Sequence, residues 1–237
     1  MTRVAVVTGV ARGIGAATAA LLTEHGWEVV GIDREKPSAP GDWHVADLTD
    51  PSSLLTVLDG LDRIDGLVNN AALQHATPLL ETTVEQWDAV QAVNVRAPFV
   101  AIRACAERLA AVGGAVVNVA SVHALATSAN VSPYAASKGA LLALTRAAAV
   151  ELGGLGVRVN AVAPGAVDTP ALREGFARQV TGDAERVLAE RTPLGRFAEP
   201  REIAEAVAFL LDGTKSGFMT GETLTVDGGV MARLSSE

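Results

Sequence analysis

Three polar residues are suited to proton transfer at a hydroxyl or carbonyl group. Tyr134 and Lys138 stand four positions apart at the start of an expected helix, so their side chains share one face of it. A free tyrosine has a pKa of about 10, and a neighbouring ammonium group favours its phenolate form. Ser121 ends an expected buried strand, where its hydroxyl can donate to a substrate oxygen. We therefore expect an acid/base centre at Tyr134.

A glycine-rich turn between the first expected strand and the first expected helix predicts a dinucleotide site. Such a turn lets a pyrophosphate approach the free N–H groups at the helix N-terminus. Asp33 ends the second expected strand, where a carboxylate accepts hydrogen bonds from an adenosine ribose and repels a 2′-phosphate. We therefore expect NAD rather than NADP, although Arg12 and Arg34 are each able to face a phosphate. The glycines of the turn are Gly9, Gly13 and Gly15.

Apolar runs that alternate with helical patterns predict the elements that position these residues. The strand-like runs fall at residues 4–7, 28–32, 66–68, 115–119 and 157–162, with weaker candidates at 43–46 and 223–226. The helical patterns fall at residues 13–25, 52–58, 85–109, 135–152 and 201–211. Short Val-rich runs are typical of a parallel sheet covered on both faces. We predict an α/β fold: a doubly wound, Rossmann-like parallel sheet of about seven strands, with helices on both faces.

We expect a single domain over residues 1–237 with one specialised segment. Residues 166–197 contain five arginines and helical pieces without a strand. A segment of this length in a compact domain is typical of a functional lid, so we expect it to cover the substrate. A solvated pair of helices is the alternative. Arg173 and Arg178 are candidates to bind an acid or phosphate, although most lid arginines suit a solvated helix face.

Composition excludes several functional classes. The formal net charge of −8 argues against binding to nucleic acid or to anionic lipid. The single cysteine, Cys105, forbids an intramolecular disulfide and argues against a zinc–thiolate site. The apolar runs are far shorter than the roughly 20 residues of a membrane span, and no signal peptide is expected. We expect a cytoplasmic protein with a small-molecule substrate and no metal.

The motifs, taken in order, resemble the short-chain dehydrogenase/reductase family over residues 4–229. The turn TGVARGIG matches the family pattern TGxxxGxG, and Tyr134 with Lys138 matches YxxxK. The segment NNAA matches NNAG, with Ala72 in place of the glycine. The ending VDGG matches the usual C-terminal segment of the family. The resemblance therefore implies the fold and an oxidoreductase activity.

The resemblance also implies a role for each matched residue. Tyr134 would take the alcohol proton as hydride leaves for the nicotinamide, and Lys138 would also bind the nicotinamide ribose. Asn94 would hold a water that links Lys138 to solvent; a helix kink near Pro98 is the alternative. The implied catalytic residues are Asn94, Ser121, Tyr134 and Lys138. The implied cofactor-binding residues are Gly9, Arg12, Gly13, Ile14, Gly15, Asp33, Asp47, Leu48, Asn70, Ala71, Tyr134, Lys138, Pro164, Gly165, Val167 and Thr169.

The substrate is less well defined by the sequence. The candidate pocket residues are Gln74, His123 and Val131, together with Ser121 and Tyr134. His123 can donate to a hydroxyl or a carboxylate, or else pack as a loop histidine. We expect an NAD-dependent oxidoreductase that transfers a hydride between a secondary alcohol, or its ketone, and nicotinamide. The alternatives are an NADPH-dependent 3-oxoacyl thioester reductase, a non-catalytic dinucleotide sensor, and a lyase or epimerase on the same fold.

The expected helix at residues 135–152 predicts an assembly. Its only charged residues are Lys138, Arg146 and Glu151, whereas an amphipathic surface helix has one apolar stripe and a polar back. We expect a homotetramer, with a dimer as the fallback, that buries this helix and its neighbour. Coverage by the chain's own lid or C-terminal tail is the alternative. The small residues expected on the neighbouring helix are Val100, Ala101, Ala104 and Cys105.

Overall fold

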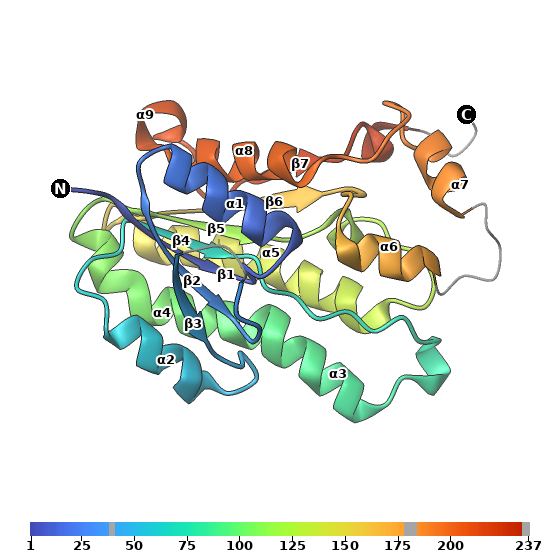
Figure 1. The fold of residues 1–237 in the computed structure, drawn as a ribbon, viewed down its shortest axis with the longest axis horizontal. Helices are drawn as coiled ribbons and strands as arrows, with labels where there is room; N and C mark the ends of the chain where they lie inside the picture. The colour runs from blue at the N-terminus through green and yellow to red at the C-terminus, as the bar shows by residue number, and fades with distance from the viewer. Residues whose placement is uncertain (38–40, 178–183, 234–237) are drawn as a thin grey trace.

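The computed structural model describes residues 1–37, 41–177 and 184–233 (Figure 1). Its strands form one seven-stranded parallel sheet in the order β3-β2-β1-β4-β5-β6-β7. The predicted α/β fold class is therefore confirmed. The strands are β1 (Val4–Thr8), β2 (Glu28–Asp33), β3 (Asp42–Val45), β4 (Gly66–Asn69), β5 (Ala115–Val119), β6 (Arg158–Pro164) and β7 (Thr223–Val226).

Helices cover both faces of the sheet. α1 and α8 pack together on one face, and α2, α4 and α5 lie on the other (Figure 1). The α-helices are α1 (Gly13–Glu24), α2 (Pro51–Asp59), α3 (Val84–Gln91), α4 (Ala97–Ala110), α5 (Ser132–Gly153), α6 (Pro170–Ala177), α7 (Ala184–Arg191), α8 (Pro200–Leu211) and α9 (Gly213–Ser216). Short helical turns are η1 (Leu79–Glu81), η2 (Ala92–Arg96), η3 (Val122–Ala124) and η4 (Val230–Ala232). None of the described helices is both long and apolar enough to cross a membrane.

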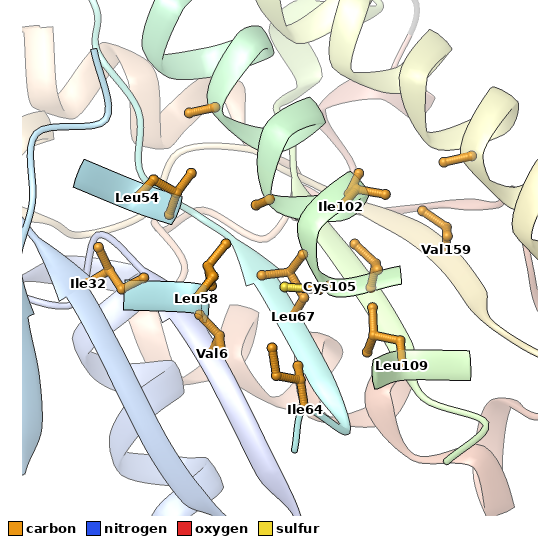
Figure 2. Close-up of a cluster of buried hydrophobic side chains, with 14 of the residues drawn as sticks. Val6, Ile32, Leu54, Leu58, Ile64, Leu67, Ile102, Cys105, Leu109 and Val159 are labelled. Carbon is orange, nitrogen blue, oxygen red and sulfur yellow. The ribbon is translucent and has the colours of Figure 1, made fainter. Parts of the chain in front are cut away.

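The hydrophobic core lies in two layers, one on each face of the sheet. Successive strand residues point to opposite faces, so Val6 packs under α2 and α4 while Val7 packs under α1 and α8. Figure 2 shows the first layer, where Cys105 of α4 is fully buried. Burial raises the pKa of the Cys105 thiol to about 12, so this thiol is unreactive at neutral pH.

The predicted helix at residues 85–109 is divided in the structure. α3 ends at Gln91, a π-helical turn spans Ala92–Arg96, and α4 begins at Ala97. Pro98 lies in the first turn of α4, where a missing N–H donor costs little. A π-turn arises from local hydrogen bonds that the hydrophobic pattern does not report, and such turns are frequent at functional sites. The division therefore places Asn94 inside an irregular turn.

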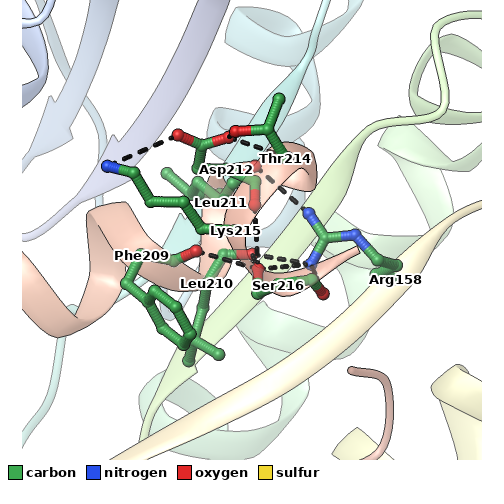
Figure 3. Close-up of polar contacts among 8 residues, drawn as sticks. All are labelled: Arg158, Phe209, Leu210, Leu211, Asp212, Thr214, Lys215 and Ser216. Atoms are coloured by element: carbon green, nitrogen blue, oxygen red, sulfur yellow. Dashed lines mark hydrogen bonds and ion pairs between the residues drawn. The ribbon is translucent and has the colours of Figure 1, made fainter. Parts of the chain in front are cut away.

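A half-buried arginine joins the C-terminal end of α8 to the sheet. The last carbonyls of a helix lack intrahelical donors, and Arg158, at the start of β6, supplies them (Figure 3). Its guanidinium donates to the carbonyls of Leu210 at 2.8 Å and Leu211 at 3.2 Å, and to the Oγ of Ser216 at 3.0 Å. This contact fixes α8 against β6, whose other end leads toward α6.

Candidate active site

The glycine turn between β1 and α1 leaves no room for a side chain at Gly9 or Gly15. Gly9 has a φ of 74°, and an added Cβ there would lie 2.8 Å from the Cα of Ala71. A Cβ on Gly15 would lie 2.0 Å from the carbonyl oxygen of Gly9. Among the described residues, neither a capping side chain nor a first-turn acid occupies the N-terminus of α1. The turn therefore fits a dinucleotide pyrophosphate, which needs free N–H groups and close backbone approach.

Asn70 and Thr8 join the ends of β1 and β4. The Nδ2 of Asn70 donates to the carbonyls of Thr8 at 2.9 Å and Gly9 at 3.1 Å. The Oγ1 of Thr8 accepts from the backbone N–H groups of Asn70 and Ala71 at 3.0 and 3.1 Å. The strand order reverses between these two strands, and ligands of doubly wound sheets bind at this reversal.

Asp33 lies at the end of β2, beside the glycine turn. Its Oδ2 accepts from the backbone N–H of Ala11 at 2.9 Å, and its Oδ1 accepts from that of Glu35 at 3.1 Å. Each carboxylate oxygen has a further lone pair for another donor. The carboxylate is therefore oriented by the backbone and still able to accept hydrogen bonds from ribose hydroxyls.

Both arginines that are able to face a phosphate have a carboxylate partner. The Nη1 of Arg12 lies 3.4 Å from the Oε1 of Glu174 in α6. The Nε of Arg34 lies 4.0 Å from the Oε1 of Glu35. These contacts reduce the positive charge available to a 2′-phosphate, and the first of them also joins α6 to the glycine turn.

The remaining cofactor candidates lie around the same sheet edge. Asp47 accepts from the N–H and the hydroxyl of Thr49, both at 2.8 Å, and these hydrogen bonds hold its pKa below the usual value. Leu48 beside it is buried. Thr169 lies in the segment after β6, and a Cβ added to Gly13 would lie 3.2 Å from its Cγ2. This segment therefore contacts the glycine turn.

The structure brings Ser121, Tyr134 and Lys138 together. Ser121 directly follows the end of β5, and the other two lie on the first turns of α5. The Ser121 side chain lies close enough to the Tyr134 phenol to lower its pKa. The Nζ of Lys138 lies 5.5 Å from the centroid of the Tyr134 ring and donates to the carbonyl of Val119 at 2.7 Å.

In the protein without a cofactor, the pKa of Tyr134 is raised, whereas the sequence predicted that it would be lowered. Burial raises the pKa of Tyr134, and the hydrogen bond from Ser121 only partly opposes this effect. Burial also lowers the pKa of Lys138 to about 7. The reason is that desolvation penalises the charged form of each group. The chain by itself therefore does not favour a phenolate at Tyr134.

A buried polar ladder positions α5 on the sheet. The Nδ2 of Asn69 donates to the Oδ1 of Asn118 at 2.8 Å, and the Nδ2 of Asn118 donates to the Oγ1 of Thr145 at 2.9 Å. Thr145 in turn donates to the carbonyl of Leu141, within α5, at 2.8 Å. Sequence reasoning missed Asn118 and Thr145, although a polar residue inside the apolar run 115–119 was an available signal. The ladder fixes the helix that carries Tyr134.

Asn94 is fully buried and holds a loop against α5. Its Oδ1 accepts from the N–H of Leu73 at 2.8 Å, and its Nδ2 donates to the carbonyl of Leu73 and to the Oγ of Ser137, both at 2.9 Å. Ser137 donates to the carbonyl of Tyr134 at 2.7 Å. Because both amide protons are engaged, a relay water would bind to other atoms of Asn94.

The candidate substrate residues have different surroundings in the structure. The ring of His123 meets that of Tyr134 edge-on, whereas Gln74 is exposed on the loop after β4 and Val131 is buried just before α5. Arg173 is less suited to an anionic substrate than expected, because its Nη2 lies 2.6 Å from the Oδ2 of Asp168. Arg178 lies outside the described residues. No group of three or more His, Cys, Asp or Glu residues in the described part of the chain could hold a metal ion.

A doubly wound sheet with a glycine turn at its reversal and a Ser–Tyr–Lys cluster at the same edge defines a dinucleotide-dependent enzyme class. Residues 9–231 match a family model described as enoyl-(acyl carrier protein) reductase. The chain belongs to the short-chain dehydrogenase/reductase family. It is an oxidoreductase, and named relatives act on CH–OH groups.

Characterised relatives match over nearly the whole chain. The cis-4-hydroxycyclohexanecarboxylate dehydrogenase of Sinomonas cyclohexanicum is 39% identical, covering 97% of each protein. The L-xylulose reductase of Bos taurus is 38% identical, also covering 97% of each. The ligand-free aldohexose dehydrogenase of Thermoplasma acidophilum superposes with a TM-score of 0.94 at 30% identity, covering 99% of this chain and 96% of that one. Of the similar solved structures, two hold NADP, one of them at low occupancy, and another holds NADH.

Proposed function

We propose that this protein is an NAD-dependent oxidoreductase that transfers a hydride between a secondary alcohol, or its ketone, and the cofactor, with Tyr134 as the acid/base. The convergence of Ser121, Tyr134 and Lys138 at the edge that carries the glycine turn is the observation on which this proposal rests. Relatives that act on cyclic alcohols and sugars support the class of substrate. A series of secondary alcohols assayed for NADH formation tests the proposal.

The side chains divide the chemistry among them. When bound, oxidised NAD supplies the hydride acceptor and a positive charge. Ser121 hydrogen-bonds the substrate oxygen, and Tyr134, as phenolate, takes the hydroxyl proton while the carbon-bound hydrogen leaves as hydride. Lys138 holds the ribose and favours the phenolate in its protonated form. The products are a ketone and NADH, with the proton on Tyr134.

The proposed cofactor choice depends on Asp33. We expect kcat/KM with NAD to exceed that with NADP by about tenfold or more, roughly 1.4 kcal/mol, because the carboxylate accepts from ribose hydroxyls and repels a 2′-phosphate. Asp33→Ser should narrow the ratio of the two kcat/KM values, whereas Glu28→Gln, a change in an exposed carboxylate at the other end of β2, should leave it unchanged. Equal or higher kcat/KM with NADP would favour the 3-oxoacyl thioester reductase.

We also propose a homotetramer built on the outer faces of α4 and α5. Val150 of α5 is 83% exposed and Phe99 of α4 is 49% exposed, so both leave apolar surface uncovered. The expectation for Ala101 and Cys105 was wrong, because both are buried in the chain's own core. Light scattering at micromolar concentration should give four times the chain mass of 24.3 kDa. A stable monomer would refute the assembly.

A further inference from the structure

His123 is held against the catalytic ring. η3 follows β5 directly, and the backbone N–H of His123 donates to the Oγ of Ser121 at 3.2 Å. The imidazole meets the Tyr134 ring edge-on, with the centroids 5.9 Å apart and an interplanar angle of 76°. The side chain is half-buried. A substrate whose reacting oxygen binds Ser121 and Tyr134 therefore brings its neighbouring atoms close to this ring.

Hydrogen bonds on one side of the ring define its tautomer. The Nδ1 of His123 lies 2.9 Å from the Oγ1 of Thr127, and the Thr127 hydroxyl donates to the carbonyl of Ser128 at 3.4 Å. Because a hydroxyl carries a single proton, this arrangement favours Thr127 as the acceptor of a hydrogen bond from Nδ1–H. A neutral imidazole with its proton on Nδ1 has a lone pair on Nε2. Burial lowers the pKa of His123, which favours this neutral form.

The second ring nitrogen is free to bind a ligand. In the described part of the chain, the Nε2 of His123 has no hydrogen-bond partner and the ring forms no ion pair. A lone pair accepts from an O–H group and offers no donor to a carboxylate. Arg173 in α6 is paired with Asp168, so it does not supply the positive charge that a substrate carboxylate would need.

We propose that His123 accepts a hydrogen bond from a second hydroxyl group of the substrate. The enzyme then selects secondary alcohols with a neighbouring hydroxyl, such as polyols, sugars and cyclic diols, over hydroxy acids. The inference rests on the proposed function, since it places the reacting alcohol on Tyr134. It assigns the acceptor role to the ring, in place of the donor role expected from the sequence.

The test compares cis-1,2-cyclohexanediol with cyclohexanol and 3-hydroxybutyrate, with NAD as the oxidant. The wild-type kcat/KM for the diol should exceed that for the monoalcohol by about tenfold, the effect of one specific hydrogen bond. His123→Phe keeps a ring against Tyr134 but removes the acceptor, so this ratio should fall to near one. His123→Gln, which presents a carbonyl near the position of Nε2, should retain most of the ratio. His25→Phe, in an exposed histidine after α1, should leave it unchanged.

Different results would overturn the inference about His123 and the proposed function, so the two can be tested separately. An equal loss on diol and monoalcohol in His123→Phe would show a packing role and overturn the inference. A preference for 3-hydroxybutyrate that His123→Phe abolishes would show a donor role and also overturn it. Absence of turnover on every secondary alcohol would overturn the proposed function itself.

The tautomer is measurable without activity. In ¹⁵N-histidine-labelled enzyme, the signals of His123 are identified by their loss in His123→Phe. At neutral pH they should report a protonated Nδ1 and an unprotonated Nε2. A proton on Nε2 would overturn the acceptor role, whatever the rates. Thr127→Val, which removes the partner of Nδ1, should shift the population toward the other tautomer.

Discussion

Tyr134→Phe should lower kcat on a secondary alcohol by about 10²-fold or more, because the substitution keeps the ring and removes the phenol that we propose exchanges the hydroxyl proton. The ring packing against His123 is retained, so the Tm should change little. The binding constant for NAD, measured by fluorescence titration, should stay within about threefold, because a dinucleotide gains little ground-state binding from the proton-transfer group.

A companion variant separates the acid/base from its hydrogen-bond partner. Ser121→Ala removes the hydroxyl that interacts with the Tyr134 phenol and should also reduce kcat. The pH dependence of kcat should change less than it would on loss of the phenol. Near-normal kcat in Tyr134→Phe on any good substrate would place the catalyst elsewhere.

Lys138→Met should abolish most of the activity and yet stabilise the cofactor-free protein at neutral and acidic pH. The Lys138 amine is 2% exposed, and burial lowers its pKa from 10.5 to about 7. The folded state therefore binds fewer protons than the unfolded state between these pH values. As the pH falls from 10.5 to 7, the wild type should lose roughly 5 kcal/mol of unfolding free energy relative to the variant, at about 1.4 kcal/mol per pKa unit.

The difference in unfolding free energy between wild type and Lys138→Met has two contributions, and its pH dependence separates them. Loss of the hydrogen bond to the Val119 carbonyl costs about 1–3 kcal/mol at every pH, whereas the desolvation effect disappears above pH 10.5. Urea denaturation of both proteins at pH 7 and pH 9.5 measures the difference. Lys215→Met, in an exposed lysine that pairs with Asp212, is the matched control and should show no comparable pH dependence. A pH-independent difference for Lys138→Met would mean that the amine is solvated in the folded protein.

Much of the fold could be predicted because its apolar runs are short, Val-rich and separated by helical patterns. A parallel sheet buried on both faces produces this pattern directly, so the prediction for β5 agrees with its observed bounds, Ala115–Val119. The π-turn at Ala92–Arg96 could not be predicted in this way. It accompanies contacts of Asn94 with residues far away in the sequence, and the helical period across it is almost unchanged.

The proximity of the candidate residues could be predicted from the sequence, whereas their electrostatics could not. The spacing of Tyr134 and Lys138 places both on one helix face, as the structure has them. The directions of their pKa shifts depend on burial by several elements at once, and no short motif contains that information. The same holds for Arg173, because its pairing with Asp168 reflects the local fold at the start of α6.

Hydride transfer from the alcohol to NAD can be followed directly with deuterium. A series of secondary alcohols with deuterium on the carbinol carbon is incubated with the enzyme and NAD, and the reduced cofactor is analysed by mass spectrometry. Direct hydride transfer predicts one deuterium in each NADH molecule formed, with the ketone as the other product and only a trace with Tyr134→Phe. Formation of NADH without deuterium, or no reduction of NAD by any alcohol in the series, would contradict the account.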